Sequence, residues 1–258
     1  MCRLAAYHGT PATLGRFLLD PPHGLVRQAY APREMREARL NADGFGFGWF
    51  DDRGRPGVYT HHIPIWNDVN LAHLGRALRA HQWLANVRSA TPPTPAAPFN
   101  TMPFLSDRLL FLHNGYLEAF GDGLRARLRR ALAPPFEDAV QGNTDSEHLF
   151  QWLRQIMERE GDPPLQALAT AAHRLDGWLD GRRALLNVVL GDGRCLVALR
   201  HAIRGDCPSL YYTEDDPLWP GACVIASEPL TEGDHWRAVP PHHLLAVEDG
   251  GRARLHAL

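Results

Sequence analysis

Short apolar segments recur along the chain, and each is bounded by glycine, proline or aspartate. Segments of this length and composition are typical of β-strands. We expect strands at residues 44–50, 57–63, 83–87, 109–113, 184–190, 195–200, 222–226 and 244–247.

The segments between these strands show a longer hydrophobic period. Leucines at helical spacing predict amphipathic helices over residues 68–82 and 144–160. Shorter helices are expected at about 164–175 and 124–132. Because helices cluster in the middle of the chain and strands occupy both ends, antiparallel sheets with segregated helices are favoured over an alternating parallel sheet. The predicted fold class is α+β.

Length and composition limit the number of domains and the kind of partner. A chain of 258 residues with 45% hydrophobic content can fill one large domain, so we expect a single domain over residues 1–258. The net charge of -2 and the pI near 6.7 offer no basic surface for nucleic acid or an anionic membrane. The expected ligand is therefore a small molecule.

No segment approaches the roughly 18 apolar residues of a membrane span, and the N-terminus lacks the profile of a signal peptide. We therefore expect a cytoplasmic protein. The four cysteines are scattered, and the histidine pairs 61–62 and 242–243 lack the spacing of metal ligands. Neither a metal nor another cofactor is expected.

Cys2 is the first candidate for chemistry. Initiator methionine is readily removed before a small side chain, which would leave Cys2 with a free α-amine beside its thiol. A free α-amine and a thiol have similar ordinary pKa values, about 8 and about 8.5, so the amine can take the thiol proton. A cysteine at this position also occurs by chance, so the residue alone does not decide the function.

Polar residues follow two of the predicted strands. Arg88 can bind a carboxylate through two parallel hydrogen bonds, and Thr91 can add a hydroxyl; a surface arginine with a turn-forming threonine is the open alternative. After the strand at 109–113, the Asn114 amide and the Gly115 N–H could form an oxyanion hole. Asn-Gly is also typical of a turn. The proline-rich segment 91–98 predicts a rigid active-site loop.

Asp145 lies at the expected start of the helix over 144–160. Thr144 and Glu147 have the spacing of a helix cap, which leaves the Asp145 carboxylate available for a substrate ammonium. The segment 41–49 alternates glycine with aromatic residues, a pattern that indicates close packing of another backbone.

These elements, in this order, resemble the class II glutamine amidotransferase family of N-terminal-nucleophile hydrolases. The resemblance implies a four-layer αββα sandwich in which two antiparallel sheets lie between helix layers. It also implies a thiol nucleophile, an oxyanion hole and binding sites for the charged ends of a glutamyl group. The implied catalytic residues are Cys2, Asn114 and Gly115, and the implied substrate-binding residues are Arg88, Thr91, His113 and Asp145.

Further segments resemble one hydrolase branch of that family, which cleaves a γ-glutamyl conjugate of a betaine-bearing sulfoxide. These segments are residues 20–25, 30–32, 41–44, 64–66 and 226–229. The family pattern Arg-Trp-Ala-Thr-His-Gly reads Arg-Ser-Ala-Thr-Pro-Pro at residues 88–93. Phe45, Trp49 and Trp66 are candidates for an aromatic wall around a trimethylammonium group.

The expected activity is therefore hydrolysis of a γ-glutamyl amide through a glutamyl thioester, with release of glutamate. No second catalytic domain that could use ammonia is expected within 258 residues, which favours hydrolysis. Two alternatives stay open at this point. The chain could be a glutaminase subunit that supplies ammonia to a separate synthase, or an inactive homologue that acts as a binding module.

Overall fold

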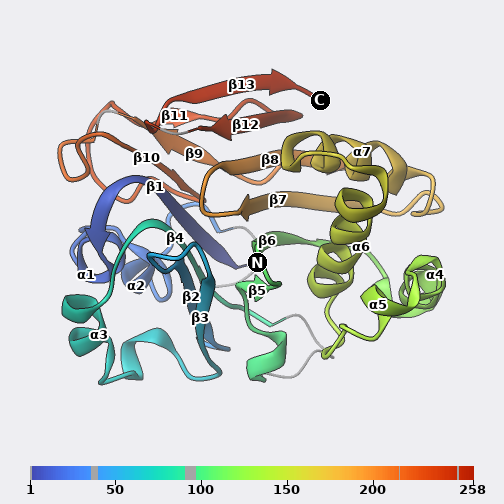
Figure 1. Cartoon of the computed structure of the whole chain (residues 1–258), viewed down its shortest axis with the longest axis horizontal. Coiled ribbons are helices and arrows are strands. Elements are labelled where there is room, and N and C mark those ends of the chain that lie inside the picture. Colours follow the sequence, from blue (N-terminus) through green and yellow to red (C-terminus); the bar gives the residue numbers. More distant parts are fainter. Residues whose placement is uncertain (1, 36–39, 91–96, 215, 249) are drawn as a thin grey trace.

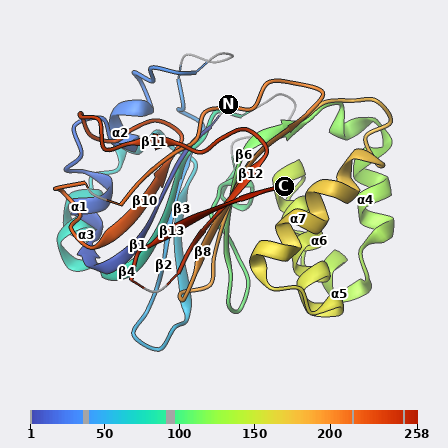
Figure 2. The ribbon, with the colours of Figure 1, turned by 90° about the horizontal axis from the view of Figure 1, so that it is seen from above.

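The computed structural model describes residues 2–35, 40–90, 97–214, 216–248 and 250–258. Two antiparallel sheets pack face to face, and each sheet carries helices on its outer face (Figure 1). Figure 2 shows the four layers from above, with α1–α3 on one side, the strands in the middle and α4–α7 on the other side. The predicted α+β class and the four-layer αββα arrangement are confirmed.

The first sheet has seven strands in the order β11-β9-β10-β1-β4-β2-β3. They are β1 (Arg3–Thr13), β2 (Phe45–Phe50), β3 (Pro56–His61), β4 (Arg79–Val87), β9 (Tyr211–Thr213), β10 (Ala222–Ala226) and β11 (Arg237–Ala238). The second sheet has six strands in the order β13-β12-β8-β7-β6-β5. They are β5 (Phe104–Leu105), β6 (Leu110–Leu117), β7 (Ala184–Gly191), β8 (Leu196–Ile203), β12 (His243–Val247) and β13 (Ala253–Ala257).

The helices form two layers, one on the outer face of each sheet. The layer on the first sheet consists of α1 (Leu14–Leu18), α2 (Leu25–Gln28) and α3 (Leu71–Ala77). The layer on the second sheet consists of α4 (Arg125–Ala131), α5 (Pro134–Glu137), α6 (Asp145–Glu160) and α7 (Pro164–Asp176). Short 3₁₀ helices lie at Ile65–Asn67 and Pro98–Asn100, and a π-type turn spans Phe120–Leu124.

Strand β1 shows how the layers are held together. Successive side chains of a strand point to opposite faces. Leu4 and Ala6 belong to the core between the two sheets, whereas Ala5 and Tyr7 pack with α1 on the outer face. Because β1 pairs with both β4 and β10, it is the middle strand of the first sheet. Its first residues therefore lie where both sheets can supply side chains.

The structure differs from the sequence-based expectation at three places. The strand β1 was not expected, because Gly9 and Pro11 interrupt its pattern; the register with β4 shifts between His8 and Ala12. The helix predicted over 68–82 is wrong at its end, since it stops at Ala77 and the following residues form β4. Tertiary pairing with β1 overrides the local helical period there.

The third difference concerns the segment around Asn114 and Gly115. Strand β6 does not end at His113 but continues to Leu117, and Asn114 lies opposite Asn187 of β7. The Asn-Gly dipeptide is therefore part of a strand and not a turn. Other elements that the hydrophobic pattern did not indicate are α1, α2, α5, β5, β9, β11 and β13.

No helix within the described ranges is long and apolar enough to cross a membrane. Over the same ranges, no group of three or more histidine, cysteine, aspartate or glutamate side chains is arranged to hold a metal ion.

Candidate functional site

Cys2 lies directly before β1, at one end of the sandwich. Leu4 faces the core between the sheets, so the alternation of the strand directs Cys2 to the same side. The half-buried Cys2 thiol lies 3.8 Å from the carbonyl oxygen of Ser89. Since Ser89 follows β4, the proposed nucleophile lies between the first strand and the loop that leaves β4.

The amide of Asn114 connects the second sheet to the start of β1. Asn114 is fully buried, and its Nδ2 donates to Ser227 Oγ over 3.1 Å. The same hydroxyl oxygen accepts a hydrogen bond from Leu4 N at 3.1 Å, and Ser227 N donates to Leu4 O at 2.9 Å. Asn114 Oδ1 is buried without a hydrogen-bond partner. A single hydroxyl therefore links the predicted oxyanion-hole amide to the strand that follows Cys2.

His113 faces the opposite side of β6, toward α6. Its Nε2 lies 3.0 Å from Leu185 O and its Nδ1 lies 2.9 Å from Ser146 Oγ. Because a carbonyl oxygen only accepts, Nε2 donates to Leu185 O, and Nδ1 is in hydrogen-bond contact with the Ser146 hydroxyl, which also lies 3.2 Å from Asp145 Oδ1. Both ring nitrogens are therefore used inside the protein. On the same face, a Cβ at Gly115 would overlap the Leu185 carbonyl, so this position requires glycine.

Arg88 is buried, with 4% of its surface exposed, at the end of β4. Its Nη1 donates to Asp43 O at 3.3 Å, and the Asp43 carboxylate accepts from Ala90 N at 2.8 Å. Burial lowers the pKa of Arg88. The electrostatic interactions that oppose this effect involve Cys2, Asp43 and Asp145. The guanidinium group therefore shares one neighbourhood with the thiol and two carboxylates.

Asp145 is the first residue of α6. Its Oδ2 accepts from Leu117 N at 2.7 Å, and its Oδ1 accepts from Ser146 N at 2.7 Å. A carboxylate at a helix N-terminus is stabilised by the helix dipole. The predicted cap is confirmed, because Thr144 Oγ1 accepts from Glu147 N at 3.2 Å. Asp145 is thus held in a fixed position between β6 and α6.

The structure brings Cys2, Arg88 and Asp145 into one neighbourhood, and Asn114 reaches it through Ser227. His113 faces α6 instead. Thr91 and most of the predicted active-site loop lie outside the described residues.

Arg3 and Glu228 form a buried ion pair beside Cys2 that was not expected. Arg3 Nε lies 2.7 Å from Glu228 Oε1, and the two side chains are 2% and 1% exposed. Arg3 Nη1 donates to the carbonyl oxygen of Cys2 at 3.0 Å. The guanidinium therefore joins the end of β10 to the backbone of the proposed nucleophile.

Glu228 also accepts hydrogen bonds from a second segment. Its Oε2 accepts from His23 Nε2 at 2.9 Å and from Arg33 N at 2.8 Å, and its Oε1 accepts from Glu34 N at 3.0 Å. Burial alone would raise the pKa of Glu228. The hydrogen bonds and the charge of Arg3 outweigh burial and lower this pKa to about 2. The Glu228 carboxylate is therefore ionised, and both of its oxygen atoms accept hydrogen bonds within the protein.

The sequence contained one signal for these residues. The segment 226–229 carries the family resemblance, but nothing in a linear pattern shows that Glu228 meets Arg3 across 225 positions. Asp43 likewise lies in a segment that was interpreted as a packing feature and as part of the family resemblance, but no role was predicted for Asp43 itself.

A cavity of about 390 Å³ adjoins this network. It is bordered by Arg3, Glu34, Arg200 and Tyr211, among others, and therefore has a polar, charged lining. The Tyr211 hydroxyl donates to Glu34 Oε1 at 2.9 Å. A carboxyl group beside a phenol ring is able to attract a cation.

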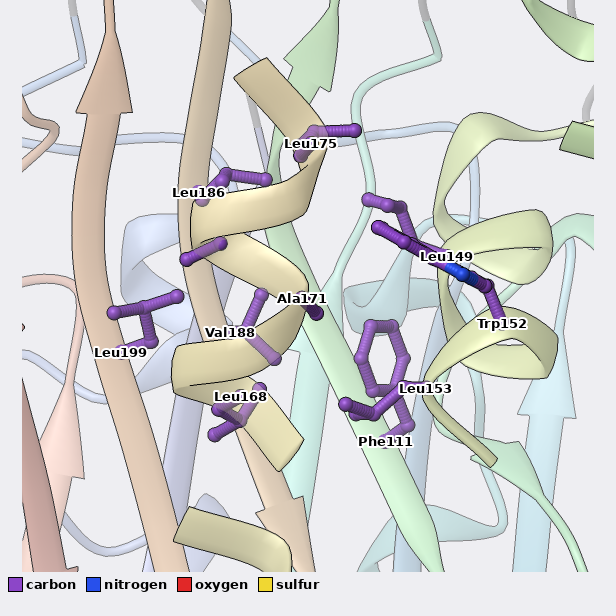
Figure 3. A pocket seen from close by; sticks show the side chains of 11 residues that line it. Phe111, Leu149, Trp152, Leu153, Leu168, Ala171, Leu175, Leu186, Val188 and Leu199 are labelled. Carbon is purple, nitrogen blue, oxygen red and sulfur yellow. The ribbon is translucent and has the colours of Figure 1, made fainter. Parts of the chain in front are cut away.

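A second cavity, between α6, α7 and the second sheet, is of a different kind (Figure 3). Its volume is about 30 Å³, and leucine, valine, alanine and aromatic side chains line it. Figure 3 shows Leu149, Leu153 and Leu168 pointing into this space from the two helices. A space of this size without polar partners is a packing gap in the core.

The aromatic wall predicted from the sequence is not formed by the expected residues. Phe45 is fully buried, and the partly buried Trp49 packs against the same hydrophobic cluster under α1–α3. Trp66 is 42% exposed and contacts Tyr30 edge-on, with ring centroids 5.8 Å apart. Strand alternation directs Phe45 and Trp49 away from the space between the sheets.

Comparisons with known proteins identify relatives in sequence and in fold. A model of the class-II glutamine amidotransferases matches residues 27–217. A gamma-glutamyl-hercynylcysteine sulfoxide hydrolase of Mycolicibacterium smegmatis is 33% identical over 249 residues, which cover 96% of this chain and 96% of the relative.

Two solved structures are similar over the whole chain. A glutamine aminotransferase class-II domain protein of Silicibacter pomeroyi has a TM-score of 0.74 and 30% identity, with 100% of this chain and 99% of that chain covered. The glutamine phosphoribosylpyrophosphate amidotransferase of B. subtilis has a TM-score of 0.63 and 16% identity, with 99% and 49% covered, and shares the fold. The chain belongs to the class-II glutamine amidotransferase family.

Proposed function

We propose that this chain is an N-terminal-cysteine amidohydrolase that cleaves a γ-glutamyl amide bond and releases glutamate. The observation that carries the proposal is the position of the Cys2 thiol, 3.8 Å from the carbonyl oxygen of the residue after the buried Arg88, together with the anchored Asp145 carboxylate that interacts electrostatically with Arg88. A glutamyl group has an α-carboxylate and an α-ammonium at one end and the γ-carbonyl at the other. One cation, one anion and one nucleophile are the groups that such a substrate requires.

In the proposed reaction, Cys2 becomes the first residue after removal of Met1. Its α-amine takes the thiol proton, and the sulfur attacks the γ-carbonyl carbon. The proton then passes to the leaving nitrogen, the C–N bond breaks, and a glutamyl thioester remains on Cys2. Water attacks the thioester carbon, the C–S bond breaks, and glutamate leaves with regeneration of the thiol.

The oxyanion of each tetrahedral intermediate would be stabilised by Asn114 Nδ2 and the Gly115 N–H. Ser227 Oγ supports this role. It receives hydrogen bonds from both Leu4 N and Asn114 Nδ2, while Asn114 Oδ1 has none. Rotation of the amide by about 180° would let Oδ1 accept the Ser227 hydroxyl proton, satisfy both groups and free Nδ2 for the oxyanion. We therefore assign Ser227 as the positioning residue for Asn114.

Arg88 and Thr91 are proposed to bind the glutamyl α-carboxylate, and Asp145 the α-ammonium. The buried guanidinium of Arg88 and the anchored carboxylate of Asp145 support these roles. Charge-assisted hydrogen bonds are strongest where water is excluded. A direct substrate contact by His113 is not retained, because both of its ring nitrogens bond within the protein.

The proposed substrate is γ-glutamyl-hercynylcysteine sulfoxide, an intermediate of ergothioneine biosynthesis. The relative of M. smegmatis carries that activity in its name, at 33% identity. The betaine of this substrate has a trimethylammonium group, and the cavity beside Cys2 contains Glu34 and Tyr211 in hydrogen-bond contact. A carboxylate with an aromatic ring suits a quaternary ammonium, and the aromatic side chains expected from the sequence do not line this cavity.

Glutamate release tests the proposal. We expect kcat/KM to be highest for γ-glutamyl-hercynylcysteine sulfoxide, lower for γ-glutamylcysteine and lowest for glutamine. Equal hydrolysis of glutamine would remove the pathway assignment and favour the glutaminase alternative. No glutamate from any of the three, with protein that lacks Met1, would favour the binding-module alternative and contradict the amidohydrolase.

A further inference from the structure

The cavity beside Arg3 is also bordered by Arg200, for which the described residues provide no ion pair. Arg200, on β8, donates through Nε to Pro208 O at 2.7 Å and through Nη1 to Val239 O at 2.5 Å. Both acceptors are uncharged carbonyl oxygens, and Arg200 has no carboxylate partner among the described residues. A partly buried guanidinium in this situation attracts an anion.

Arg3 supplies a second unsatisfied group at the same cavity. Its Nε and Nη1 donate to Glu228 and to the Cys2 carbonyl, but its Nη2 is buried and has no hydrogen-bond partner among the residues that the structure describes. Such an orphaned donor is costly unless a ligand or water meets it. Since Arg3 Nη1 touches the Cys2 backbone, this donor lies next to the proposed nucleophile.

We propose that this cavity holds the leaving group, and that Arg3 and Arg200 bind a carboxylate on the carbon attached to the scissile nitrogen. The inference rests on the proposed function. The glutamyl side of the substrate points toward Arg88 and Asp145, so the leaving amine lies on the other side of the acyl carbon. A carboxylate on that amine is separated from the acyl carbon by only three covalent bonds.

The preferred substrates are therefore γ-glutamyl derivatives of α-amino acids. Ammonia has no carboxylate, so it would meet neither Arg200 nor the Nη2 group of Arg3, and the cavity is unnecessary for a glutaminase. A cavity of about 390 Å³ also has room for a side chain beyond the carboxylate. The proposed reaction is unchanged: the same C–N bond breaks, and the leaving amino acid departs with the proton from the Cys2 α-amine.

Two synthetic substrates that differ only in this carboxylate test the proposal. They are γ-glutamyl-S-methylcysteine sulfoxide and its decarboxylated analogue, γ-glutamyl-S-methylcysteamine sulfoxide. For the wild-type protein we expect kcat/KM to be about 30-fold or more higher for the carboxylated compound, as charge-assisted hydrogen bonds imply. A ratio near one would overturn the proposal, while cleavage of both compounds would leave the amidohydrolase function intact. Cleavage of neither would contradict the function itself.

Substitutions at Arg200 test whether its guanidinium group binds the carboxylate of the leaving group. Arg200→Gln keeps a donor for the Pro208 carbonyl but removes the charge, and should lower the substrate ratio about tenfold. Arg200→Lys keeps the charge and should retain most of the ratio. Arg55→Gln, an exposed arginine paired with Asp51, is the matched control and should change nothing. An unchanged ratio in folded Arg200→Gln protein would contradict the assignment.

Occupancy of the cavity can be measured without turnover. Cys207 borders the cavity, so a bound leaving group should shield its thiol from alkylation. In Cys2→Ala protein, the carboxylated compound should slow alkylation of Cys207 about tenfold at saturation, whereas glutamine should not. Equal alkylation with and without the bound compound would place the leaving group elsewhere.

Discussion

Arg3 Nε donates to Glu228 Oε1 over 2.7 Å, and both side chains are almost completely buried. The pair joins the first strand of the sheet to the residues after β10. Because Arg3 also donates to the Cys2 carbonyl, the position of the proposed nucleophile depends on an interaction between the two ends of the chain. A buried ion pair of this kind holds geometry more than it adds stability.

Loss of the Glu228 charge should destabilise the fold. Glu228→Gln leaves the Arg3 guanidinium buried without a counterion, which costs about 3–5 kcal/mol. Urea unfolding should show a decrease of this size in the free energy of unfolding. Glu232→Gln removes an exposed partner of Arg33 and should change the free energy of unfolding much less, because solvent screens exposed ion pairs. Equal stability of the two variants would show that the buried pair is not important.

The same carboxylate makes stability depend on pH in the acid range. The pKa of Glu228 is lowered from its usual 4.5 to about 2 in the folded protein. The unfolded chain therefore binds a proton at Glu228 before the folded chain does, and the stabilisation is complete above about pH 4.5 and lost as the pH falls toward 2. The stability difference between wild type and Glu228→Gln should shrink over this range. A difference that stays constant from pH 5 to 2.5 would contradict the ionised state of Glu228.

Ser227 should matter for the rate of the chemical step. Ser227→Ala removes the only hydrogen-bond partner of the Asn114 side chain among the described residues, so Asn114 would be free to turn away. We expect kcat to fall about tenfold with little change in KM, and Asn114→Ala to lower kcat about 10²-fold. Ser106→Ala, a serine remote from the site, is the control. A change in KM alone would assign Ser227 to substrate binding instead.

Arg88 and Asp145 should both be needed for binding the glutamyl group. Arg88→Lys retains the charge but loses the planar pair of donors, and kcat/KM should fall about 10²-fold. Asp145→Asn should have a similar effect on substrates that carry an α-ammonium, and a smaller one on glutaryl amides, which lack it. Steady-state kinetics with the two substrate types measure this difference. Identical losses for both types would mean that Asp145 acts only through its bond to Leu117 N.

The fold class followed from patterns that are local. Strands β7, β8 and β10 are continuous apolar runs, and α6 and α7 have a clear helical period with a cap or an N-terminal proline. The strand β1 was missed because its alternation is weak and its stability comes from pairing with β4 and β10, which are distant in sequence. The helix predicted over residues 68–82 was too long for the same reason, because its last residues pair with β1 as part of β4.

Only part of the site could be predicted from the sequence. Cys2, Arg88, Asn114 and Asp145 lie in short motifs that resemble a family, and those motifs suggested their roles. Ser227 and Glu228 act through contacts across more than 100 positions, and no linear spacing encodes such contacts. The direction of the His113 side chain could not be predicted either, because it depends on whether Asn114-Gly115 forms a turn or continues the strand.

The identity of the nucleophile is the central claim, and mass spectrometry of the purified protein tests it most directly. After reaction with a thiol-reactive glutamine analogue, we expect a chain that begins at Cys2 and carries one adduct, located on Cys2 by peptide mapping. Cys195→Ala protein should give the same result, and Cys2→Ala protein should give no adduct. An active protein that retains Met1, or an adduct on Cys195, Cys207 or Cys223 with Cys2 unmodified, would contradict the account.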